Sequence, residues 1–97
     1  MHSQVVKATL QPGKVDDGIA LFNDSVAPVV RERTGFQNAY LLVDRAGNKI
    51  IAVGFWDSEA DVAALISSGF YQEQGAKFGA LFAGPPEREV YEVAVRV

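Results

Sequence analysis

The side chains that most often carry enzyme chemistry are scarce in this sequence. It has no cysteine and a single histidine, His2, next to the first residue. A thiol nucleophile, a zinc finger and a disulfide framework are therefore excluded. Because chain termini are commonly mobile, a catalytic base or a metal cage built on His2 is not expected. The sequence thus predicts no metal site, and we expect no cofactor.

The residues left for chemistry carry aromatic or amide side chains. Trp56 is the only tryptophan, and Asn38 and Tyr40 stand two apart in an apolar run typical of a strand. Two interpretations of Trp56 are open: a cavity wall that stacks on a flat ligand, or burial with its N–H bonded to a carbonyl. Asn38 is unusual in a strand, and it either binds a ligand or satisfies a neighbouring loop. By strand alternation, Asn38 and Tyr40 are expected on the same face as Phe36 and Leu42.

A second aromatic group recurs at helical spacing later in the chain. Its members are Phe70, Tyr71, Phe78 and Phe82. Such a stripe is usually core, and a ligand-binding wall is the alternative. Gly75 and Gly79 lie in the same stretch, although glycine in a helix costs about 1 kcal/mol relative to alanine. Close backbone approach, room for a ligand and a loosely wound helix are all open as the reason.

Hydrophobic periodicity predicts the elements that position these residues. Strands are expected over residues 4–11, 36–44, 49–56 and 89–97. Helices are expected over residues 15–33, 58–66 and 70–83. Within the first helix, Pro28 lacks an N–H, which predicts a kink or restart near Asp24 and Ser25.

The resulting order is β-α-β-β-α(α)-β, the ferredoxin-like α+β arrangement. Four antiparallel strands would carry the helices on one face. The two middle strands are apolar on both sides, as the consecutive residues Leu41, Leu42 and Val43 illustrate. The second face therefore also needs a cover. A second copy of the sheet is the simplest one, so we expect a homodimer through the open sheet face.

Composition and charge narrow the possible partners. Hydrophobic residues make up 48% of the chain and charged residues 22%, as in a globular protein rather than a disordered one. The 97 residues are expected to form a single domain, 1–97. A formal net charge of −3 argues against nucleic acid as a partner. No apolar run approaches the ~18 residues of a membrane span, so we expect no membrane partner and a cytoplasmic location.

Short stretches along almost the whole chain resemble the antibiotic biosynthesis monooxygenase family, which has the dimeric α+β-barrel fold. The stretches are Pro12-Gly13-Lys14-Val15, Pro28, Gly35-Phe36, Tyr40-Leu41-Leu42-Val43-Asp44 and Phe55-Trp56-Asp57-Ser58-Glu59-Ala60. The resemblance implies the same fold and, among the activities of the family, cofactor-free oxidation of phenolic substrates to quinones. Because one fold hosts many chemistries, a non-catalytic ligand-binding dimer and a structural dimer are the alternatives.

The resemblance also assigns roles to individual residues. In the oxygenases and haem degraders of the family, a tryptophan at the end of the third strand lines the ligand cavity, and Trp56 matches it. Haem degraders add a histidine on the later helix and an asparagine on the first strand, and this chain has neither. Haem degradation is therefore not expected.

The expected site combines these residues around a small aromatic ligand. Trp56, Asn38 and Tyr40 are the predicted catalytic residues, as hydrogen-bond donors to a developing oxyanion. The predicted substrate contacts are Phe70, Tyr71, Phe78, Phe82 and Gly79. No obvious general base is present, which leaves a tyrosine, an inward-facing Glu73 or a substrate that arrives ionised.

Overall fold

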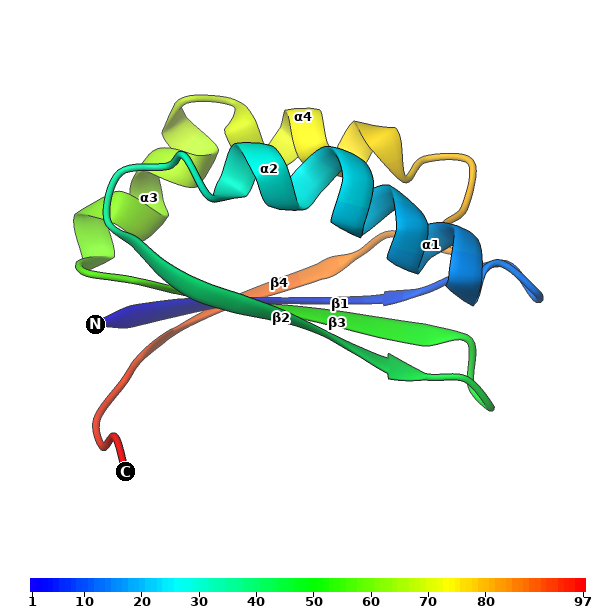
Figure 1. The fold of residues 1–97 in the computed structure, drawn as a ribbon, viewed down its shortest axis with the longest axis horizontal. Coiled ribbons are helices and arrows are strands. Elements are labelled where there is room, and N and C mark those ends of the chain that lie inside the picture. Colours follow the sequence, from blue (N-terminus) through cyan, green and yellow to red (C-terminus); the bar gives the residue numbers. More distant parts are fainter.

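The computed structural model describes residues 1–97 and places every helix on one face of a four-stranded antiparallel sheet (Figure 1). The strands are β1 (His2–Thr9), β2 (Phe36–Asp44), β3 (Lys49–Trp56) and β4 (Glu87–Glu92). They lie in the order β2-β3-β1-β4, and all neighbours are antiparallel. This is the split βαβ arrangement, so the predicted ferredoxin-like α+β fold is confirmed.

The first helical segment is interrupted beside Pro28, as the sequence predicts. It consists of α1 (Val15–Leu21), a π-helical turn η1 (Phe22–Val26) and α2 (Ala27–Val30). Pro28 has no N–H to donate to the carbonyl four residues earlier, and the N–H of Ala27 bonds to the carbonyl of Phe22, five residues back. The segment ends at Val30, a few residues before the expected boundary near residue 33.

The second helical layer contains α3 (Glu59–Ser67) and α4 (Phe70–Lys77). The side chain of Ser58 caps α3 by accepting a hydrogen bond from the N–H of Asp61 at 3.2 Å. The prediction that the last helix continues to residue 83 is wrong. The chain leaves the helix because its backbone bonds to the end of β1: the N–H of Ala83 donates to the carbonyl of Thr9 at 2.8 Å.

The last strand is also displaced from its expected range of 89–97. It begins at Glu87 and ends at Glu92, whose partner is His2, the first paired residue of β1. Strand β4 pairs only with β1, and the N–H of Val93 still donates to the carbonyl of Met1 at 3.0 Å. Residues beyond 93 have no residue of β1 left to pair with. Alternation along residues 93–97 therefore did not predict a strand correctly.

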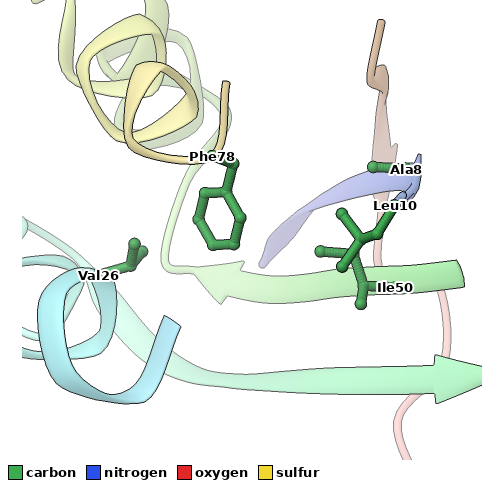
Figure 2. Packing of buried hydrophobic residues seen from close by; sticks show 5 residues of the cluster. All are labelled: Ala8, Leu10, Val26, Ile50 and Phe78. Carbon is green, nitrogen blue, oxygen red and sulfur yellow. The ribbon is translucent and has the colours of Figure 1, made fainter. Parts of the chain in front are cut away.

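The core lies between the sheet and the helices in two clusters. The first contains Ala8, Leu10, Val26, Ile50 and Phe78. Figure 2 shows Phe78 reaching from the helical layer toward the strands that carry Ala8 and Ile50. The second cluster contains Trp56, Val62 and Leu65. None of the helices combines the length and apolar character that a membrane span requires.

Candidate functional site

A cavity of about 110 Å³ lies between the sheet and the helices, with a mostly hydrophobic wall. Residues of β1, β2, β3, η1 and α4 contribute to it. A dry cavity of roughly 150 Å³ holds one benzene ring, so this space accommodates about one ring. A second hollow beside α1 and β2 shares Phe22, Ala39 and Leu41 with the cavity wall. Because the cavity is only partly enclosed, a ligand of more than one ring would extend beyond it toward solvent.

Trp56 is part of this wall and is only 3% exposed. Its ring lies over Gly54, where a Cβ atom would come within 2.6 Å of the indole atoms Cη2 and Cζ3. Phe36 packs edge-on against the ring at a centroid distance of 5.8 Å. The indole N–H is buried without a hydrogen-bond partner. Burial with the N–H bonded to a carbonyl, one of the two interpretations of Trp56, is therefore not what the structure contains.

The aromatic residues of the last helical stretch gather at the same cavity. Phe70, Tyr71, Phe78 and Phe82 all line it, and Phe78 also belongs to the buried core. Phe78 and Phe82 stack at a centroid distance of 5.8 Å. The aromatic stripe is therefore both core and cavity wall, although the sequence patterns presented these as alternatives.

The two glycines of this stretch differ in their surroundings. Gly75 lies within α4 and lines the cavity, and a Cβ atom there would meet nothing within 4 Å. Gly79, a predicted substrate contact, lies beyond the end of α4 and outside the cavity wall. A Cβ atom at Gly79 would lie 3.4 Å from the carbonyl oxygen of Ala76. Only Gly75 leaves volume that a ligand could use.

Asn38 and Tyr40 are not brought together with Trp56. Both are exposed, and the Asn38 amide donates to the Tyr40 hydroxyl at 3.2 Å. An irregularity in the pairing of β2 with β3 lies between Phe36 and Asn38. This bulge breaks the alternation, so Phe36 packs against Trp56 on the helix side while Asn38 and Tyr40 project from the opposite face. The expectation that all of them share one face is wrong for this reason.

Three residues of the site were not identified from the sequence. Gln4 and Gln74 line the cavity, and Gly54 supports the Trp56 ring. A glycine inside a strand often marks a close approach, and Gly54 stands two residues before Trp56 on the same face, so this signal was available. Gln74 is four residues from both Phe70 and Phe78, on the same side of the helical stretch. Its amide alone does not distinguish it from a surface glutamine.

Arg88 borders the site from β4 and packs over Tyr71. Its guanidinium carbon lies 5.5 Å from the Tyr71 ring centroid, and its Nε donates to the side-chain oxygen of Gln4. Arg88 is therefore partly buried against the site. Burial raises the pKa of Tyr71 above its ordinary value of 10.0, and the nearby Arg88 charge partly opposes this. The Tyr71 phenol is thus a proton donor at neutral pH, not a base.

The cavity wall contains no aspartate, glutamate, histidine or lysine. Glu73 is exposed and lies outside the wall, and Lys77 donates to the carbonyl of Ser25 at 3.1 Å instead of pairing with Glu73. No three acidic, histidine or cysteine side chains are grouped to hold a metal ion. The arrangement can hold and desolvate an aromatic molecule and donate hydrogen bonds to its oxygen, but it holds no carboxylate or imidazole base.

The sequence of this chain matches a known protein family and two curated proteins. Residues 1–83 match the protein family described as antibiotic biosynthesis monooxygenase. An uncharacterized protein of Mycobacterium tuberculosis, Rv2558, is 34% identical over 86 residues, which is 88% of this chain and 35% of that protein. The chain thus spans about a third of the length of the curated relatives it matches.

Solved structures with the same fold include two oxygenases. SnoaB of Streptomyces nogalater, described as a cofactor-independent oxygenase, superposes with a TM-score of 0.80 at 16% identity, over 99% of this chain and 95% of that one. A monooxygenase from the ActVA-Orf6 gene of Streptomyces coelicolor, solved with nanaomycin D, has a TM-score of 0.75 at 19% identity. The alignment covers 99% of this chain and 89% of that chain. At these identities the likeness shows the fold.

Proposed function

The chain belongs to the antibiotic biosynthesis monooxygenase family, and we propose that it is a cofactor-independent monooxygenase acting on a small phenolic or other aromatic substrate. Residues 1–97 would act as one domain of this family. The observation that carries the proposal is the apolar cavity beside the buried Trp56, whose N–H has no partner. The description of SnoaB as a cofactor-independent oxygenase supports the same chemistry.

In the proposed reaction, a deprotonated phenol passes one electron to dioxygen. The two radicals combine into a peroxide, and loss of water from the protonated peroxide leaves the new carbonyl of a quinone. One dioxygen is consumed, one of its oxygen atoms enters the product and the other leaves as water. The apolar wall would exclude solvent from these charged species, while Trp56 and Tyr71 supply donors for oxygen atoms.

The cavity contains no evident base for removal of the phenolic proton. No carboxylate or imidazole lines it, and the pKa of Tyr71 is raised by burial. We infer that the substrate binds as the neutral phenol and then loses its proton to solvent. The rate should then rise with pH through the pKa of the substrate itself, and substrates with more acidic phenols should shift the profile to lower pH.

Fluorescence of the single tryptophan tests whether the cavity accepts such molecules. Naphthol- or anthrone-like compounds should quench Trp56 saturably, because a ring in the cavity stacks beside the indole. Gly75→Leu should abolish the quenching by filling the space that Gly75 leaves open. Ala76→Leu is the matched control, since Ala76 is exposed and outside the wall. Linear quenching, or unchanged binding by Gly75→Leu, would refute the cavity proposal.

Oxygen consumption separates the two functions that share this cavity. A monooxygenase should consume dioxygen with an anthrone-like substrate and no added cofactor, and Gly75→Leu should remove this activity. The absence of a base in the wall favours a second candidate, a module that binds an aromatic molecule without converting it. Saturable binding without oxygen consumption would support that candidate.

We propose that a second copy of the chain covers the open sheet face. No helix packs on this face (Figure 1). Tyr40, Leu42 and Tyr91 are 57%, 50% and 51% exposed in the single chain. By alternation these residues share the face with Ile51 and Phe55 of β3. Apolar groups spread over the centre of a sheet favour a homodimer, in which Tyr40 would lie at the interface.

A further inference from the structure

Two buried polar atoms of the cavity residues lack hydrogen-bond partners. They are the indole Nε1 of Trp56, which can only donate, and the side-chain oxygen Oε1 of Gln74, which can only accept. Both residues line the same cavity. Buried polar atoms without partners are rare in native proteins, and each one therefore calls for a physical explanation.

Two other polar side chains nearby are already engaged, and the Tyr71 hydroxyl bonds to neither of the two atoms. The oxygen of Gln4 accepts a hydrogen bond from Arg88, and the hydroxyl of Ser3 donates to the carbonyl of Gly54 at 2.9 Å. The rest of the wall is mostly hydrophobic. The protein thus supplies no partner for the Trp56 donor or for the Gln74 acceptor. A bound molecule can therefore form hydrogen bonds to both atoms.

We propose that Gln74 is a specificity-determining residue, which acts with Trp56 to select aromatic ligands that carry a hydroxyl group. A hydroxyl is the smallest group that satisfies both atoms: its oxygen accepts from the Trp56 N–H and its proton is donated to the Gln74 carboxamide oxygen. An ether oxygen satisfies only the donor, and an alkyl group satisfies neither. This proposal rests on the proposed function, because it uses the same cavity.

The position of Gln74 on α4 fits this role. It lies one turn from Phe70 and one turn from Phe78, both of which line the cavity. Its neighbour Gly75 leaves open space beside it. Gln72, two residues away, is exposed and outside the wall. The same helix thus offers one glutamine at the cavity and one matched glutamine in solvent.

Three naphthalene probes separate donor from acceptor requirements, and the methoxy and ethyl compounds match each other in size. Naphthol donates and accepts, methoxynaphthalene only accepts, and ethylnaphthalene does neither. Calorimetric titration of the full chain at neutral pH should show naphthol binding at least about fivefold more tightly than methoxynaphthalene, because the ether leaves the Gln74 acceptor buried and unpaired. Methoxynaphthalene should in turn bind several-fold more tightly than ethylnaphthalene.

Variants assign each step to its residue. Gln74→Leu should remove the preference for naphthol over methoxynaphthalene and keep the preference for methoxynaphthalene over ethylnaphthalene. Trp56→Phe should keep the preference for naphthol over methoxynaphthalene and remove the preference for methoxynaphthalene over ethylnaphthalene. Gln72→Leu should leave both preferences unchanged. Gln74→Met, which keeps the side-chain length, gives the same test if the leucine variant does not fold.

Equal binding of naphthol and methoxynaphthalene to the wild type would overturn the role of Gln74 and leave the cavity proposal standing. The same conclusion follows if both Gln74 variants keep the full preference for naphthol. If the wild type binds none of the three probes, the proposed function fails together with this inference. These outcomes are therefore distinguishable in one set of titrations.

Discussion

Replacing Gly54 by alanine should displace the Trp56 ring from its place in the cavity wall. The added Cβ would lie 2.6 Å from two carbon atoms of the indole. Carbon atoms pack best at about 3.5–4.0 Å, so the ring or the strand must move by roughly 1 Å. Trp56 is packed against Val62, Leu65 and Phe36, and the cavity is the space beside it that is free. We therefore expect the ring to move into the cavity.

Overpacking a buried site of this kind costs about 1–3 kcal/mol of unfolding free energy. For a chain of this size each 1 kcal/mol corresponds to a fall in Tm of about 4–8 °C. The same displacement reduces the volume open to a ligand, so saturable quenching by naphthol should weaken as well. Stability and ligand binding should fall together, because one ring movement causes both.

The measurement is urea unfolding of wild type and variant at equal protein concentration, followed by the fluorescence of Trp56. Gly75→Ala is the control, since a Cβ atom there meets nothing within 4 Å. In a helix this change should be neutral or stabilise by up to about 1 kcal/mol. If Gly54→Ala unfolds at the same urea concentration as wild type and binds naphthol equally well, the reasoning about the Trp56 wall is refuted.

Three further predictions concern the assembly and the stability of the fold. Leu42→Asp should convert a sedimenting dimer into a 10.5 kDa species, while Ile66→Asp on exposed helix surface should not; a monomeric wild type would contradict the proposed dimer. Ser58→Ala removes the cap of α3 and should lower the unfolding free energy by about 0.5–2 kcal/mol in urea. The pKa of Glu89 is lowered by the hydrogen bond from Tyr91 and then by Lys7, so its ionised form stabilises the folded state above the ordinary pKa of 4.5. This contribution is lost as the pH falls through the lowered pKa, so Glu89→Gln should lose less stability than wild type on acidification. Equal losses in wild type and variant would show that these contacts of Glu89 do not stabilise the folded state.

Local patterns in the sequence determined the element order and hence the fold class. A 3.6-residue period over α1 and the apolar runs of β2 and β3 are properties of neighbouring residues, and they needed no knowledge of the rest of the chain. The interruption beside Pro28 was predictable for the same reason, since a missing N–H acts within one helical turn. The family resemblance identified Trp56 on an equally local match around residues 55–60.

Features that depend on partners distant in the sequence were decided only by the tertiary structure. The last helix ends at Lys77, and the chain beyond it bonds to the end of β1, more than 70 residues away in the chain. Strand β4 stops at Glu92 because its single neighbour starts at His2. Propensity along residues 78–83 and 93–97 carries no information about these contacts.

The residues of the site likewise divide into those that the sequence pattern predicts and those that only the tertiary structure brings together. Alternation placed Asn38 and Tyr40 with Phe36, and one bulge in β2 reversed that assignment, because an extra residue exchanges the two faces of a strand. The aromatic spacing of residues 70–82 was visible in the sequence. That the Trp56 donor and the Gln74 acceptor line one apolar cavity without partners was not visible, because an unpaired hydrogen bond is defined by everything that surrounds it in space.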